Sequence, residues 1–139
     1  MNRLVASLSV ALITLSACRT YIPYVATPIG DPAQARRVMQ QTLEEQRYEN
    51  APAHVEVTNE RFRVVRSRGG NADEGDLYGT SVYYTRITDI LLSKRKGVYA
   101  VSILGPDRVL LIHVFAYDEE TAERFIDALG TMRSLAKGG

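Results

Sequence analysis

The first eighteen residues constrain this chain more than any other stretch, because they decide which part of it is left to fold. Arg3 precedes a mainly apolar segment that begins at Leu4, and small residues then lead to the only cysteine, Cys18. This is the layout of a secretory signal. The apolar stretch is about 14 residues long, against the roughly 20 that cross a bilayer as a helix. We therefore expect residues 1–17 to be removed as a signal peptide.

The end of this segment reads Leu15-Ser16-Ala17-Cys18, which resembles the lipobox of bacterial lipoproteins. The resemblance implies cleavage before Cys18 and acylation of its thiol; the alternative is a free, partly buried thiol. Each buried acyl methylene contributes about 0.8 kcal/mol of membrane affinity, so such an anchor is practically permanent. In these lipoproteins an Asp after the cysteine favours the inner membrane. Arg19 stands there instead, which implies the periplasmic side of the outer membrane.

The remaining 122 of the 139 residues have the usual size of one domain with one core. Removal of residues 1–17 takes away Arg3 and no acid, which leaves 16 basic and 16 acidic side chains. A neutral balance gives no electrostatic reason to expect a nucleic-acid partner. With a single cysteine there is no internal disulfide, so burial of apolar surface must stabilise the fold.

We expect residues 18–30 to be the lipidated cysteine and a tether. Pro23 and Pro28 push the residues before them toward extended conformations, and no helical period is visible. Tyr21 and Tyr24 are too apolar for a freely solvated linker. They are expected either to rest at the lipid interface or to pack on the domain.

Residues 31–137 are predicted to form a single α+β domain with a helix at each end. Asp31-Pro32 is a helix start, and apolar residues recur at helical spacing to about Tyr48. Asp118 is expected to cap the last helix, with acids in its first turn. The apolar stripe of the first helix is Ala35, Val38, Met39, Thr42, Leu43 and Gln46; that of the last is Ala122, Phe125, Ile126, Leu129, Met132 and Leu135.

Between the helices the hydrophobic period changes to two, which predicts a bent antiparallel sheet of about six strands. The expected strands are 54–57, 61–68, 77–85, 87–92, 98–104 and 108–115. Val65 breaks the alternation, so a bulge or strand end is expected near Val64-Val65. The last strand is apolar on nearly every residue, which predicts a place inside the sheet with both faces covered.

Two groups of basic residues are candidate contacts for a partner or for anionic headgroups. The first is Arg61 and Arg63 on an expected strand, and the second is the turn Lys94-Arg95-Lys96 before Gly97. The alternative is that these side chains only solvate an exposed face and pair with acids.

A polar, glycine-rich loop is expected at 69–76. Its three acids suggest calcium, because hard cations prefer several oxygen ligands. They lack the spacing of a known calcium loop. We therefore expect a solvated loop without metal.

The segments 86–92, 94–97, 99–103 and 105–108, followed by Asp118 and the final apolar stripe, together resemble a bacterial pleckstrin-homology-like domain over residues 55–135. The resemblance implies a strongly bent antiparallel sheet with the C-terminal helix plugging one end. In membrane-binding members of that family an early basic hairpin holds lipid phosphates, whereas Lys94–Lys96 lie in a later one. Docking of protein segments is the family's other use.

No catalytic motif is visible, so an enzyme is not expected, and neither is a cofactor or a metal. His54 and His113 are the only histidines. A hydrolase would have to use Ser81 or Ser102 as the nucleophile with His113 as the base. The alternative is that His113 is a strand residue whose side chain is only hydrogen-bonded to a neighbour.

The expected function is that of a lipid-anchored, non-enzymatic interaction or structural subunit of a cell-envelope assembly. Its partners are the membrane, through acylated Cys18, and an envelope protein. Docking is expected at a sheet edge or in the groove beside Phe125 to Met132. The alternative is a module that binds a lipid, glycan or peptide in the cavity of the bent sheet, walled by Tyr83, Tyr84 and Tyr99.

Overall fold

The computed structural model describes residues 19–46, 52–67 and 77–138. Two helices and seven strands lie in these ranges, and two short 3-10 turns, η2 and η3, separate some of the strands. In chain order the elements are β1 (Thr20–Ile22), α1 (Pro32–Glu44), β2 (His54–Val57), β3 (Arg61–Ser67), β4 (Leu77–Tyr83), η2 (Tyr84–Arg86), β5 (Asp89–Arg95), β6 (Val98–Leu104), η3 (Pro106–Arg108), β7 (Leu110–Ala116) and α2 (Glu119–Gly138).

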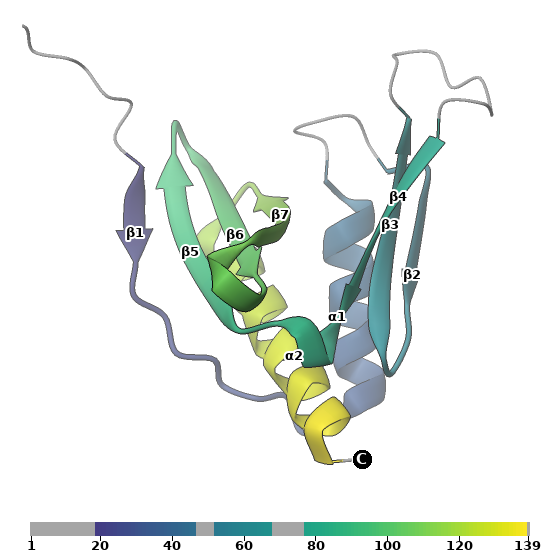
Figure 1. Cartoon of the computed structure of the whole chain (residues 1–139). Coiled ribbons are helices and arrows are strands. Elements are labelled where there is room, and N and C mark those ends of the chain that lie inside the picture. Colours follow the sequence, from purple (N-terminus) through teal and green to yellow (C-terminus); the bar gives the residue numbers. More distant parts are fainter. Residues whose placement is uncertain (1–18, 47–51, 68–76, 139) are drawn as a thin grey trace, which may run out of the picture.

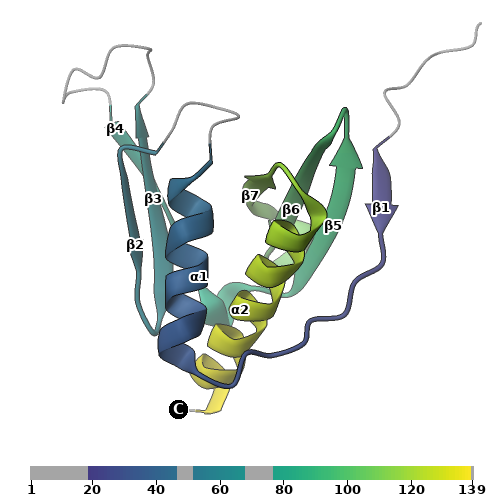
Figure 2. The ribbon, with the colours of Figure 1, turned by 180° about the vertical axis from the view of Figure 1, so that it is seen from behind.

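The predicted α+β class and the antiparallel hairpins are confirmed, but the described strands form two sheets instead of one bent sheet. One has the order β1-β5-β6-β7 and the other β2-β3-β4. Both helices lie behind the sheets in Figure 1 and in front of them in Figure 2. The break falls at η2, where three residues turn the chain between β4 and β5 and no ladder joins these strands.

Both helix starts follow the predicted capping chemistry. The Asp31 carboxylate accepts the Ala33 N–H at 2.9 Å, and Pro32 occupies the first helical position. At α2 the Asp118 carboxylate accepts the Thr121 N–H at 2.7 Å. These bonds from Thr121 lower the pKa of Asp118, because they stabilise the charged form.

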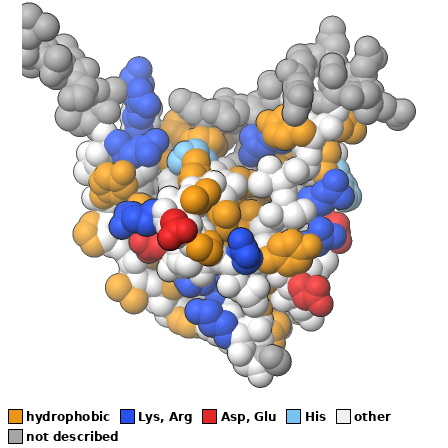
Figure 3. Space-filling view, in the orientation of Figure 1, with side chains coloured by type: hydrophobic (Ala, Val, Ile, Leu, Met, Phe, Trp, Pro, Cys, Tyr) orange, Lys and Arg blue, Asp and Glu red, His pale blue; other side chains and the backbone are white. Residues whose placement is uncertain are grey.

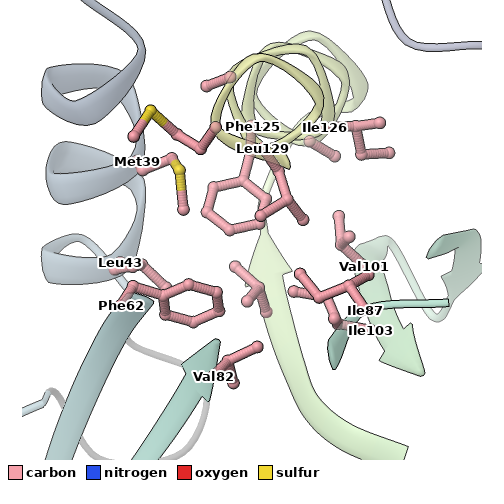
Figure 4. Packing of buried hydrophobic residues seen from close by; sticks show 14 of the residues in the cluster. Met39, Leu43, Phe62, Val82, Ile87, Val101, Ile103, Phe125, Ile126 and Leu129 are labelled. Atoms are coloured by element: carbon pink, nitrogen blue, oxygen red, sulfur yellow. The ribbon is translucent and has the colours of Figure 1, made fainter. Parts of the chain in front are cut away.

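One hydrophobic core serves both sheets and both helices. Side chains of α1 and α2 converge with those of the two sheets in Figure 4. Phe125 of α2 is completely buried and meets the Phe62 ring of β3 edge-on at a centroid distance of 6.4 Å. The apolar stripes predicted for the helices are therefore buried, except that Val38 is only partly buried and Leu135 is 40% exposed.

Two detailed strand predictions are wrong. The pairing of β3 with β2 and with β4 runs without interruption through Val64 and Val65, so no bulge lies there; the register shift falls at Ile103/Leu104. The apolar strand β7 is an edge of its sheet instead of an interior strand. Part of this edge is covered, because the buried Gln46 side chain accepts the Phe115 N–H at 3.0 Å.

The expected tether packs on the domain. Residues 20–22 add strand β1 to the edge of β5. The following segment, 23–29, is fastened to α2: the Asp127 carboxylate accepts the Tyr24 hydroxyl at 2.8 Å and the Thr27 N–H at 2.7 Å. Thr131 Oγ1 accepts the Ile29 N–H at 2.8 Å. We call residues 20–29 the strap, because they cross from the sheet edge to the start of α1.

Burial and the neighbouring Asp127 carboxylate raise the pKa of Tyr24 to about 12. Both causes disfavour the phenolate, the first by desolvation and the second by charge repulsion. The strap is thus held by a neutral phenol that donates to a carboxylate.

No helix within the described part of the chain is both long enough and apolar enough to span a bilayer.

Candidate functional site

The face of the four-stranded sheet that points away from α2 carries a floor of small side chains. Ser93, Ala100 and Ser102 lie on this face of β5 and β6, and all three are buried. The register places Tyr21 and Ser93 side by side, and then Ala100 and Phe115. Opposed residues of antiparallel strands point to the same face. Larger side chains therefore flank a floor of small ones.

A cavity of about 240 Å³ opens over this floor. We call it the arginine pocket, and the described residues that line it are Arg19, Ser93, Arg95, Val98, Ala100, His113 and Phe115. Ser93 is only 1% exposed, and its hydroxyl has no hydrogen-bond partner among the described residues. A buried hydroxyl without a partner is uncommon and calls for an explanation.

Two arginines stand at the mouth of the arginine pocket. Thr20 pairs with Lys94, so extending the register by one residue places Arg19 opposite Arg95. Both side chains are exposed and both line the pocket. No acidic side chain is among the described lining residues. Like charges opposite each other on paired strands repel, and an anion between the guanidinium groups would relieve this repulsion.

The structure brings Ser102 and His113 together as a cross-strand pair. Ser102 Oγ lies 3.0 Å from His113 Nδ1, which fits a hydrogen bond whose direction depends on the tautomer. Ser102 is 6% exposed. Ser81 lies on the other sheet, where the Arg61 guanidinium donates to its hydroxyl at 3.3 Å.

The other predicted basic residues fall into two separate regions. Arg61 and Arg63 lie on β3, in the three-stranded sheet, and the Arg61 guanidinium also stacks 5.8 Å from the Tyr83 ring centre. The guanidinium of Arg63 occupies the space beside Gly79, within 3 Å of where a Cβ would stand. Their neighbours therefore give both side chains a structural role.

Lys94 and Lys96 belong with Arg95 at the turn between β5 and β6. The Lys94 ammonium lies 5.1 Å from the centre of the Tyr99 ring, on the face opposite the arginine pocket. Lys96 and Gly97 form the turn, with φ of 50° and 78°. In Figure 3 Lys and Arg side chains stand at this end of the sheet, and others are spread over the rest of the face without forming one stripe.

The predicted tyrosine-walled cavity is not formed. Tyr84 is completely buried in the core, and its hydroxyl donates to the Thr58 carbonyl at 2.9 Å. Burial raises the pKa of Tyr84. Tyr83 is 46% exposed and Tyr99 lies under Lys94, so the three rings face different surroundings. Most apolar residues of the predicted groove beside Phe125 to Met132 are core, but Ile126 lines a cavity of about 600 Å³ together with residues of β1, the strap and β5.

Several sequence predictions fall outside the described residues. These are the signal peptide, the lipidated Cys18 and the glycine-rich loop 69–76. His54 begins β2 and is exposed. In the ranges that are described, no three His, Cys, Asp or Glu side chains come together as metal ligands.

Sequence reasoning missed Arg19 and Ser93 as parts of a site. Arg19 was assigned to the tether, and Ser93 is one polar residue in an apolar strand. One signal was available in the sequence: Ser93 is a small polar residue that lies two positions before Arg95. In a strand this spacing puts both side chains on one face. The contribution of Arg19 depends on β1, which was not predicted.

Searches against protein-family models, curated proteins and solved structures gave no match to this chain.

Proposed function

We propose that this protein is a lipid-anchored envelope lipoprotein on the periplasmic side of the outer membrane, where it serves as a non-enzymatic interaction or structural subunit. The lipobox motif Leu15-Ser16-Ala17-Cys18 is the sequence basis for the anchor. The observation that carries the proposal is that the first described strand starts two residues after Cys18. Strand β1 starts at Thr20, and the strap is hydrogen-bonded to α2 from Tyr24 to Ile29.

This arrangement leaves almost no free tether. Two residues of extended chain span about 7 Å, so an acylated Cys18 brings Thr20 to within that distance of the lipid surface. The end of the sheet where β1 begins is also the end where β5 turns into β6. Arg19, Lys94, Arg95 and Lys96 would then face the headgroups. Each such cation contributes about 1 kcal/mol of attraction to an anionic surface.

The three-stranded sheet lies on the other side of the molecule from β5 and β6 (Figure 1), and a protein partner is placed there. Strand β4 is an edge of the three-stranded sheet, and Leu77, Tyr78 and Tyr83 on it are 42%, 40% and 46% exposed. Sheet edges accept added strands, and exposed apolar side chains give such contacts specificity. An envelope protein is therefore proposed to dock on β4.

The resemblance of residues 55–135 to a pleckstrin-homology-like domain is retained as part of this proposal. A C-terminal helix packed against antiparallel hairpins supports it. The division of the strands into two sheets departs from the single bent sheet that the resemblance implies.

Mass spectrometry of the full chain purified from membranes tests the anchor. The expected result is a mature protein that lacks residues 1–17 and carries acyl chains on Cys18. A Cys18→Ala chain should keep its N-terminal segment and gain no acyl mass. Recovery of the wild type with Met1 intact and a free Cys18 thiol would overturn the proposal.

Crosslinking in intact cells tests the partner. A photoreactive residue at position 78 should yield a reproducible adduct with an envelope protein, and the same residue at position 137, at the far end of α2, should not. Equal adducts from both positions, or none from either, would count against a partner on β4.

A further inference from the structure

The arginine pocket has the composition of a site for a multiply oxygenated anion. Arg19 and Arg95 bring two guanidinium groups to its mouth, and Ser93 brings a hydroxyl to its floor. That hydroxyl is the one polar group of the pocket that is fully buried and lacks a partner among the described residues. All three groups donate hydrogen bonds, and no described carboxylate in the pocket accepts them.

The strand register explains why these donors meet. Arg19 directly precedes β1, which pairs with the strand of Arg95 at a spacing of about 4.8 Å, and Ser93 lies two residues along the same face of β5, about 7 Å from Arg95. Long arginine stems cover that distance, so both guanidinium groups reach the space above Ser93. The Ser93 hydroxyl is shielded from solvent, so ligand binding at this hydroxyl requires the side chains that cover it to move.

The size of the cavity limits the ligand. A volume of about 240 Å³ is several times the ~30 Å³ of a water molecule and lies below the roughly 300–1,000 Å³ of sites for drug-sized ligands. A compact charged group with a short stub fits, and a whole lipid does not. Phe115 and Val98 form apolar walls against which such a stub packs.

We propose that the arginine pocket binds a phosphate group through Arg19, Arg95 and the buried Ser93 hydroxyl. Guanidinium groups form paired hydrogen bonds with carboxylate and phosphate alike. A carboxylate, however, offers two oxygens in one plane, whereas a phosphate presents oxygens in three directions. Two arginines at the mouth and one hydroxyl on the floor suit the second geometry better. Neutralising the facing arginines also removes their repulsion.

The source of the phosphate is either a membrane lipid or a free phosphate ester. The lipid source rests on the proposed function, because an acylated Cys18 next to Arg19 places the pocket at the headgroup layer. A phosphodiester headgroup would then enter the pocket while its acyl chains stay in the bilayer. A soluble phosphate ester requires no anchor.

Nuclear magnetic resonance of the full, acylated chain in an uncharged detergent tests the pocket. Inorganic phosphate is the probe, and the amide signals of Ser93 and Ala100 are the readout. We expect saturable shifts at these amides. Arg95→Gln should weaken binding about tenfold, as expected for loss of a charge-assisted contact, and Ser93→Ala several-fold. Lys94→Gln is the matched control, since it removes the same charge from the other face of β5, and should change affinity less than twofold.

Absence of saturable shifts would overturn the proposal that the arginine pocket binds phosphate. Equal weakening by Lys94→Gln and Arg95→Gln would also overturn it, because binding would then follow net charge alone. Loss of binding in Ser93→Ala is interpretable because that variant removes an unsatisfied hydroxyl and keeps the fold, which its unshifted remaining amide signals would confirm.

A second pair of measurements identifies the source. In phosphatidylcholine bicelles containing phosphatidylglycerol, a lipid ligand shifts the Ser93 amide without added phosphate, and inorganic phosphate then causes no further change. If the shift requires added phosphate, the ligand is soluble and the pocket is still supported. The mass of Cys18 tests separately whether the protein is lipid-anchored. Saturable phosphate binding by a chain with an unmodified Cys18 thiol would support the phosphate site and would overturn the proposed function.

Discussion

The two sheets present their arginines in opposite ways on their outer faces. On the three-stranded sheet, Arg61 is bonded to Ser81 and stacked on Tyr83, and Arg63 fills the space that Gly79 leaves open. On the four-stranded sheet, Arg19 and Arg95 face each other over a buried hydroxyl that has no described partner. A count of basic residues along a strand therefore does not locate a site. What matters is whether their neighbours already satisfy them.

The inner faces of the same two sheets do not differ in this way. Phe62 and Val82 from one sheet and Val101 and Ile103 from the other enter a single core with the helices (Figure 4). The stability of the two sheets is therefore coupled, and the two sheets differ in this respect only on their outer faces. Five predictions break or sharpen this contrast.

The largest effect is expected at the shared core. Phe125→Ala removes a completely buried ring that meets Phe62 of the other sheet, and we expect a loss of about 3–5 kcal/mol in the free energy of unfolding. Leu135→Ala on the same helix, at a side chain 40% exposed, should cost about 1 kcal/mol or less. Denaturant unfolding measures both. Hydrogen exchange should show β3 and β6 losing protection together; loss in one sheet alone would contradict a shared core.

The next effect concerns the strap, which only the four-stranded sheet possesses. Asp127→Ala removes the acceptor of the Tyr24 hydroxyl and the Thr27 amide, and we expect a loss of about 1–3 kcal/mol. The Thr27 amide should exchange faster. An unchanged exchange rate would show that these bonds do not hold the strap.

The same variant has a signature in the pH dependence of stability. The pKa of Tyr24 is raised from 10.0 to about 12, so the fold favours the neutral phenol. That stabilisation is fully present below pH 10 and is lost as the pH rises from 10 through 12. Asp127→Ala should bring the pKa of Tyr24 closer to 10, as measured by ultraviolet titration of the tyrosines against a Tyr24→Phe chain.

A smaller effect, of opposite sign, is expected at the floor of the arginine pocket. Ser93→Ala removes a buried hydroxyl that has no described partner, so without phosphate we expect the protein to become more stable by about 1 kcal/mol. Ser102→Ala is the control, because it breaks a bond to His113 and should destabilise. Destabilisation by Ser93→Ala in phosphate-free buffer would mean that the hydroxyl already has a structural partner.

The smallest effect compares the two arginine groups directly. Arg61→Gln should lower stability by about 0.5 kcal/mol, since it loses the contacts with Ser81 and Tyr83. Arg95→Gln should be neutral or stabilising by a similar amount without phosphate, because it relieves repulsion from Arg19. Adding phosphate should stabilise the wild type and not the Arg95→Gln chain. The same sign for both substitutions would remove the contrast between the sheets.

Local features of the fold were predictable from the sequence. The caps at Asp31 and Asp118 and the strands 54–57 and 98–104 follow from hydrogen-bonding side chains and from a period of two. These signals act over a few residues. The number of sheets was not predictable, because it depends on η2, where three residues without a turn signature separate β4 from β5.

Long-range pairing also hid most of the site. Nothing near residue 19 indicates that the chain returns beside β5, because β1 has three residues and the strap is held by Asp127 and Thr131, about a hundred positions away. A basic turn was predicted at 94–97, but β5 continues to Arg95 and only Lys96 and Gly97 form the turn, so the face on which each cation lies depends on the register. Arg95 was thus predicted as a contact for a partner or a headgroup, and Ser93 and Arg19 were not predicted as parts of a site.

The orientation of the domain on the membrane tests the proposal most directly. Figure 1 places the β5–β6 turn and the C-terminal end of α2 at opposite ends of the molecule, and the 20 residues of α2 alone span about 30 Å. Lys96→Cys and Lys137→Cys, spin-labelled in the acylated protein on anionic vesicles, report the depth of each end. We predict that the label at 96 contacts the headgroup layer and that the label at 137 contacts only water. Equal depths, or a label at 137 that lies closer to the lipid, would contradict a domain held on the membrane by its arginine end.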